Sequence, residues 1–118
     1  MKHSKKQRTL GRTRRQRKAL LNGLAIALIE NGQIKTSLAK AKELRPNIEH
    51  LITFAKNDTV HSRRLVSSRL GVPKPVVLNK LFKEIAPKFK ERNGGYVRII
   101  KLGYTSPGRE EAVISFVE

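Results

Sequence analysis

Residues 13–32 read TRRQRKALLNGLAIALIENG, and this stretch decides how the chain begins to fold. Thr13, followed three residues later by Gln16, fits a capping box, in which both side chains bond free N–H groups at a helix start. Asn31-Gly32 ends the helix, since glycine adopts the left-handed conformation after a helix without strain. The aliphatic side chains between these signals recur at helical spacing and form one apolar stripe: Leu20, Leu21, Leu24, Ala25, Leu28 and Ile29.

The rest of the chain predicts an α+β fold, with about four helices packed on a small three-stranded sheet. Ser37 is expected to cap the second helix, and either Asp58 or Thr59 the third, so a capping role explains Asp58 better than a catalytic one. Pro46 lies inside the second helix, where it should kink or split the helix, and we favour a kink. In chain order, the elements expected after the first helix are an edge strand at 34–36, helices at about 38–56, 59–70 and 75–86, and strands at 96–102 and 112–117.

Positive charge is concentrated at the N-terminus. The chain has 26 Lys and Arg against 9 Asp and Glu, and nine of the basic residues but none of the acidic ones lie in residues 1–18. Such a segment cannot bury enough apolar surface to offset the entropy lost on ordering, so it needs a polyanion as partner. We predict a basic extended tail at 1–12, a single globular domain at 13–118, and nucleic acid as the polyanion.

The first turns of the predicted helix carry cations at the wrong end for the helix dipole. Arg14, Arg15, Arg17 and Lys18 each cost a few tenths of a kcal/mol there unless an anion neutralises them. Phosphate groups would do so, and the free N–H groups of a helix start also bind phosphate. A solvated basic face is the alternative interpretation.

Other basic side chains are weaker candidates for RNA contact, and each has solvated surface as its alternative. They lie on the third helix, on the strand after residue 96, and before the turn at Gly94-Gly95. Arg69 on the third helix shares this interpretation but stays outside the predicted set. The predicted RNA-binding residues are Lys2, His3, Lys5, Lys6, Arg8, Arg12, Arg14, Arg15, Arg17, Lys18, Arg63, Arg64, Arg92, Arg98 and Lys101.

Aromatic residues offer few platforms for base stacking. Phe54, Phe82, Phe89 and Phe116 lie in apolar segments, so we expect them in the core. Tyr96 and Tyr104 are expected to be free to stack on bases. The sequence therefore predicts recognition of the RNA backbone and shape more than of splayed bases.

The sequence predicts no catalytic site, no metal site and no cofactor. There is no cysteine, which removes disulfides, thiolate chemistry and cysteine-ligated metals. Asp58, His61 and Ser62 lie too close along one helical turn to form a nucleophile triad, and no phosphate-binding loop or dinucleotide fingerprint is present. No apolar run approaches the ~18 residues of a membrane span, and no small-molecule substrate is indicated.

Several strings of residues match one known family in order along the chain. The opening MKHSKKQRTLGRT at 1–13 and LAKAKELRP at 38–46 are the most specific. Further matches lie at 51–53, 61–64, 80–82, 85–87, 92–96, 98–99 and 101–103. Taken together, they resemble the bacterial-type large-subunit ribosomal protein seventeen family over essentially the whole chain. The sequence departs from the family at Gln16, often His there, at Gly23, usually Asn, at 71–77, and after Gly103.

This resemblance implies a structural constituent of the cytoplasmic ribosome, without catalysis, that supports subunit assembly and translation. The implied partners are large-subunit (23S-type) rRNA near the exit of the nascent-peptide tunnel and neighbouring large-subunit ribosomal proteins. The family's N-terminal RNA contacts carry over to Lys2, His3, Arg8, Arg12, Arg17 and Lys18.

Two other functions stay open on the sequence alone. One is a free nucleic-acid-binding module, such as a small architectural or regulatory DNA binder, which would be found free or on the nucleoid. The other is an RNA-processing enzyme, whose turnover would depend on Asp58, His61 or Glu110. A structural ribosomal protein would instead sediment with large subunits in stoichiometric amounts.

Overall fold

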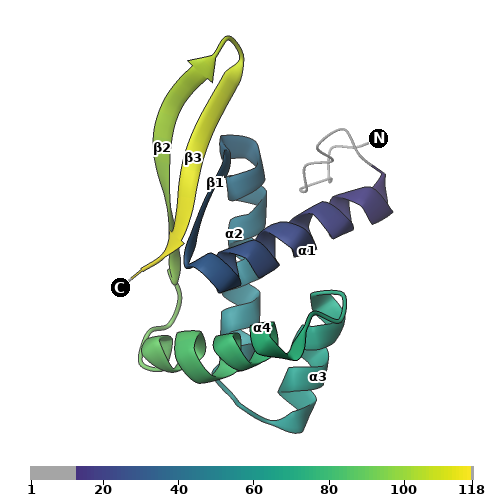
Figure 1. Cartoon of the computed structure of the whole chain (residues 1–118). Coiled ribbons are helices and arrows are strands. Elements are labelled where there is room, and N and C mark those ends of the chain that lie inside the picture. Colours follow the sequence, from purple (N-terminus) through teal and green to yellow (C-terminus); the bar gives the residue numbers. More distant parts are fainter. Residues whose placement is uncertain (1–12, 118) are drawn as a thin grey trace, which may run out of the picture.

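The computed structural model describes residues 13–117 of the chain. Four helices and a three-stranded antiparallel sheet make up this part, which confirms the predicted α+β class (Figure 1). The predicted tail at 1–12 lies outside the described residues, so the division into tail and domain stays a prediction. The elements are α1 (Arg14–Asn31), β1 (Gln33–Ser37), α2 (Leu38–Ala55), α3 (Val60–Arg69), α4 (Pro75–Lys80), β2 (Val97–Ser106) and β3 (Arg109–Phe116).

The first helix begins and ends as its sequence predicts. The backbone N–H of Gln16 donates to Thr13 Oγ1 at 3.2 Å, and that of Thr13 donates to Gln16 Oε1 at 3.2 Å, so both halves of the capping box are present. Gly32 ends α1 with φ at +81°. The two caps fix both ends of α1, so the cations of its first turn have fixed positions on the helix.

The second helix also has its predicted cap. Ser37 Oγ accepts a hydrogen bond from the backbone N–H of Lys40 at 3.3 Å. Pro46 lies within one continuous helix, so α2 is not split there. Tertiary packing of the buried stripe on both sides of Pro46 offsets the backbone hydrogen bond that proline cannot donate.

The third helix has one of its two expected caps, and the fourth helical segment is longer than expected. Thr59, and not Asp58, caps α3, because Thr59 Oγ1 accepts from the backbone N–H of Ser62 at 3.1 Å. The fourth segment continues past α4 through a π-helical turn, Leu81–Ile85, and a 3-10 turn, Ala86–Phe89. Pro87 lies in the first turn of that 3-10 segment, where no N–H is needed, so the helical path does not stop before it.

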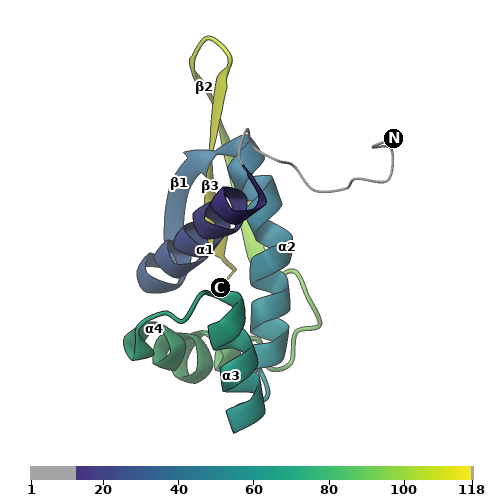
Figure 2. The ribbon, with the colours of Figure 1, turned by 90° about the vertical axis from the view of Figure 1, so that its right-hand side faces the viewer.

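The sheet has the strand order β1-β3-β2, with all neighbours antiparallel. This places β1 at an edge, as predicted. The other two strands are longer than expected and form a hairpin around the turn at Pro107-Gly108, where Gly108 has φ at +75°. The pairing of β2 with β3 shifts register next to Gly103 and Tyr104. These shifts let the two strands stay paired through residues whose sequence pattern does not favour a strand. The hairpin consequently extends beyond the helices (Figures 1 and 2).

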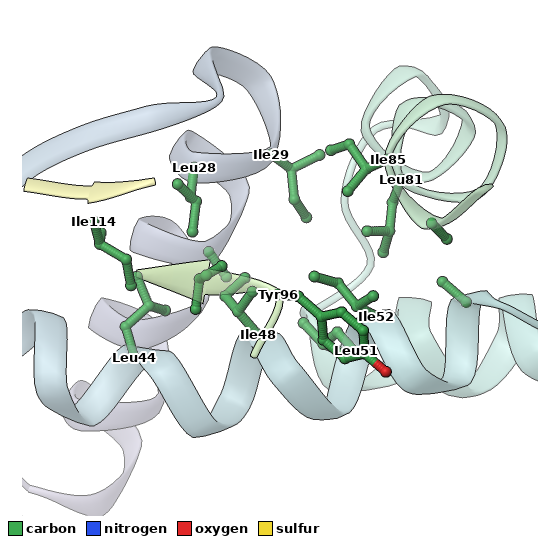
Figure 3. Close-up of a cluster of buried hydrophobic side chains, with 14 of the residues drawn as sticks. Leu28, Ile29, Leu44, Ile48, Leu51, Ile52, Leu81, Ile85, Tyr96 and Ile114 are labelled. Atoms are coloured by element: carbon green, nitrogen blue, oxygen red, sulfur yellow. The ribbon is translucent and has the colours of Figure 1, made fainter. Parts of the chain in front are cut away.

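The core lies between α1, α2, the fourth helical segment and the sheet (Figure 3). Phe82 and Phe89 are buried in the core, and Phe54 and Phe116 are partly buried and pack against it, which confirms the prediction for all four phenylalanines. The prediction for Tyr96 was wrong. It is only 2% exposed, with its ring centroid 5.3 Å from that of Phe89.

Tyr96 is buried because α2 binds the segment that leads into β2. The Glu49 carboxylate accepts hydrogen bonds from the backbone N–H groups of Tyr96 at 3.2 Å and Val97 at 3.0 Å. Lys56 places its ammonium 4.6 Å from the Tyr96 ring centroid and donates to the backbone carbonyl of Arg92. These contacts, which no local sequence pattern indicates, set the position of the loop at 92–96.

Candidate nucleic-acid interface

The start of α1 presents a cluster of cations on a capped helix. Arg14, Arg15 and Lys18 are exposed, and Arg17 is half-buried. No acidic residue lies in the first turn to neutralise them. Cations and free N–H groups thus occupy the positive end of the same helix, an arrangement that attracts phosphate.

This cluster borders a groove with a volume of about 470 Å³. One wall is α1, the second is α2, and the C-terminal end of α3 closes the groove. Figure 2 looks toward the start of α1, with α2 beside it and α3 below. The lining residues are Arg14, Arg17, Lys18, Leu21, Asn22, Ala25, Glu43, Asn47, His50, Leu51, Arg69 and Leu70.

Arg69 is the basic residue of this groove that the predicted set omitted. Its guanidinium carbon lies 5.1 Å from the ring centroid of Phe54, so the aromatic ring orients it. Arg69 lies beside Arg14 and Arg17 only because α3 packs near α1, so its position in the sequence does not indicate that it belongs to this groove. Asn22, Asn47 and His50 were missed for the same reason.

Arg63 has intramolecular partners. Its guanidinium makes two hydrogen bonds to the Asp58 carboxylate, Nε to Oδ1 at 2.6 Å and Nη2 to Oδ2 at 3.1 Å. It also donates to Asn79 Oδ1 at 3.1 Å and lies 4.9 Å from the Phe82 ring centroid. The hydrogen bond from Arg63 lowers the pKa of Asp58, and the same bond raises the pKa of Arg63. Arg63 therefore fastens α3 to the fourth helical segment.

The remaining described members of the predicted set lie apart from the groove. Arg98 and Lys101 are exposed on β2, the strand that also carries Tyr104, which is 72% exposed as predicted. Arg92 is exposed and donates through Nε to the backbone carbonyl of Gly94 at 3.2 Å. In Figure 1 the loop that leads into β2 lies on the opposite side of the molecule from the start of α1.

Arg64 is exposed on α3, and it borders a second, shallow hollow beside Val72 and Leu78. The structure therefore does not gather all the predicted residues into one patch. Six members of the set lie outside the described residues: Lys2, His3, Lys5, Lys6, Arg8 and Arg12.

Membrane-spanning helices and metal-binding clusters are both absent from residues 13–117. This part of the chain has no helix long and apolar enough to cross a membrane. Nor does it bring together three or more histidine, aspartate or glutamate side chains that could hold a metal ion.

Known proteins resemble this chain along its full length. The family model described as "Ribosomal protein L17" matches residues 20–117. The "Large ribosomal subunit protein bL17" of Sulfurihydrogenibium sp. (strain YO3AOP1) is 52% identical over 120 residues, covering 100% of this chain and 98% of that protein.

Two further relatives that carry the same name are similar to the chain at nearly the same level of identity. The protein of Persephonella marina is 51% identical, covering 100% of this chain and 96% of the relative. That of Dictyoglomus turgidum is 48% identical, covering 99% and 100% respectively. The chain therefore belongs to the ribosomal protein L17 family, and its role is structural and not enzymatic.

Proposed function

We propose that the chain is a structural constituent of the large ribosomal subunit that binds large-subunit rRNA through the start of α1. The observation that carries this proposal is the cluster of Arg14, Arg17, Lys18 and Arg69 around one groove, at the positive end of a capped helix. The names of its relatives supply the subunit. We also propose that its partners include neighbouring ribosomal proteins of that subunit. Its proposed location is the cytoplasmic ribosome.

Electrostatics favour RNA over a protein partner at this surface. The four cations around this groove outnumber the one carboxylate, Glu43, that lines it with them, so the groove keeps an excess of positive charge, to which the helix dipole adds. A phosphate backbone supplies a negative charge at each nucleotide and neutralises this excess at several points at once. Binding then releases counterions, which makes affinity strongly dependent on salt.

The direct test is the salt dependence of binding between the full chain and deproteinised large-subunit rRNA. With 6–10 phosphates contacted, affinity should fall ~10³–10⁵-fold between 50 and 200 mM salt. The double variant Arg14→Gln/Lys18→Gln should lower the slope of log K against log salt by about 1.5. It should fold at least as stably as the natural chain, because both cations are unfavourable at that helix end.

The matched control is Lys74→Gln/Lys83→Gln, which removes the same charge from exposed sites elsewhere. Its salt slope should stay close to that of the natural chain. A nearly flat salt response of the natural chain, or equal slopes for the two double variants, would contradict the proposed role of α1.

A second contact is proposed at β2 and the loop before it. Arg92, Arg98 and Lys101 provide cations there, and the exposed Tyr104 provides an aromatic face. Arg63 is proposed to contribute mainly by holding α3, where Arg64 is free to contact RNA. Arg98→Gln should weaken binding by less than the α1 double variant, as measured in the same titration.

The predicted tail is proposed to bind the same RNA. Deleting residues 1–11 should leave the domain folded but reduce its incorporation into large subunits, as measured by sedimentation. Incorporation at the level of the full chain would show that Lys2, His3, Lys5, Lys6 and Arg8 are dispensable.

We further propose a position near the exit of the nascent-peptide tunnel and a contribution to subunit assembly. The support is the family resemblance described above. A stalled nascent chain with a photoreactive residue just outside the tunnel should label this protein in intact ribosomes. Depletion of this protein from cells should cause precursors of the large subunit to accumulate. Labelling only of other proteins would place the chain elsewhere on the subunit.

A further inference from the structure

The groove between α1 and α2 has a floor and a rim of different chemistry. Its deepest residues are apolar: Ala25, Leu51 and Leu70 are each 5% exposed or less. The cations at its border are largely exposed. Two amides, the half-buried Asn22 and the exposed Asn47, line the groove together with the half-buried carboxylate of Glu43. The amides offer both hydrogen-bond donors and acceptors.

A paired RNA backbone does not need such a hollow. It presents phosphates and riboses, which a convex basic surface binds equally well. An unpaired nucleotide presents a flat apolar base, a polar base edge and a phosphate. These three parts match the apolar floor, the amides and the cationic rim in kind. The groove volume of about 470 Å³ also lies within the range of small-molecule sites.

Two contacts fix parts of the groove before any ligand arrives. The Phe54 ring orients the Arg69 guanidinium, as described above. Gly71 follows α3 with φ at +78°, and a Cβ added there would lie 3.3 Å from Asn22 Nδ2. The glycine thus lets the end of α3 approach α1 closely where Asn22 lines the groove.

We propose that this groove receives one unpaired ribonucleotide of the bound RNA. Its phosphate lies against Arg14, Arg17, Lys18 or Arg69, its base lies on the apolar floor, and the amides of Asn22 and Asn47 bind the base edge. The inference rests on the proposed function and narrows it, because the sequence alone predicts recognition of backbone and shape. It adds one site at which an extruded base contributes to binding.

The test measures binding of the full chain to hairpin RNAs at constant salt. Four hairpins carry one unpaired A, C, G or U in the stem, and a fifth has the same stem fully paired. At least one bulged hairpin should bind about fivefold more tightly than the paired one, which corresponds to about 40 Å² of base surface removed from water against the apolar floor. Asn47→Leu replaces an amide of the groove with a branched apolar side chain, without changing charge and without adding a ring that could stack on a base, and should abolish most of this difference.

Asn57→Leu is the matched control, because Asn57 is exposed beyond the end of α2 and does not line the groove. It should retain the preference. Equal binding of bulged and paired hairpins by the natural chain overturns the inference but leaves RNA binding intact. A preference that Asn47→Leu leaves unchanged overturns the location. Failure of the natural chain to bind any hairpin or deproteinised large-subunit rRNA overturns the proposed function itself.

Discussion

Glu49→Gln perturbs the contact that joins α2 to the segment entering β2. The carboxylate accepts two backbone hydrogen bonds, at 3.2 Å from Tyr96 and 3.0 Å from Val97. Hydrogen bonds to a charged group contribute about 1.5–3 kcal/mol each. Glutamine keeps one acceptor oxygen but turns an NH₂ group toward the other backbone N–H. We therefore expect the free energy of unfolding to fall by about 2 kcal/mol.

The assay is thermal and urea unfolding of the full chain, which should give a Tm lower by about 8 °C for a domain of this size. Hydrogen exchange adds a local readout, because the amides of Tyr96 and Val97 should lose protection more than those at the centre of β3. Glu91→Gln removes the same charge from an exposed position nearby and should change the Tm by little. A Glu49→Gln protein as stable as the control, with unchanged exchange at Val97, would refute the reasoning.

Other predictions concern single positions of the domain. Thr13→Ala removes the capping box and should lower the free energy of unfolding by about 1 kcal/mol in urea titrations. Thr13→Ser keeps the capping hydroxyl and should keep the stability of the natural chain. Gly23→Ala should raise stability by about 0.5–1 kcal/mol, because the added Cβ meets no atom within 4 Å and glycine is unfavourable inside a helix. Val72 is a β-branched residue with φ at +57°, so Val72→Gly should raise the Tm. For Asp58, whose pKa is lowered in the folded chain, the natural protein should be more stable than Asp58→Asn above the ordinary carboxylate pKa. That difference should vanish as pH falls through the lowered pKa in a series of unfolding titrations.

Local signals in the sequence predicted the helices well. The capping box at Thr13 and the glycine at position 32 each satisfy backbone groups within a few residues, so their effect does not depend on the rest of the fold. The edge strand was also predictable, because its short length and its place between two helices leave few alternatives.

Long-range contacts decided what the sequence could not show. Asp58 and Thr59 are both good caps, and the sequence left the choice between them open; Thr59 is the cap, while Arg63 provides a charged partner for the Asp58 carboxylate. Tyr96 looked free because its burial depends on Glu49 and Lys56, far away in the sequence.

The candidate site follows the same division. The cations at the start of α1 were visible as a run of charge, and the structure places Arg14, Arg17 and Lys18 around one groove. The amides and Arg69 that share the groove come from helices whose crossing the sequence does not specify. The pattern of charge in the sequence therefore led to the prediction of a nucleic-acid partner, whereas the groove beside these cations became visible only in the fold.

The most direct test of the central claim is a protein–RNA crosslinking map of large subunits that contain this chain. Ultraviolet crosslinking, followed by mass spectrometry of the crosslinked peptides, locates the residues that touch rRNA. The account predicts that crosslinks concentrate on the start of α1, at residues 14–18, and on Arg69, with few on the exposed residues of the fourth helical segment. Crosslinks confined to that segment, with none at the start of α1, would contradict it.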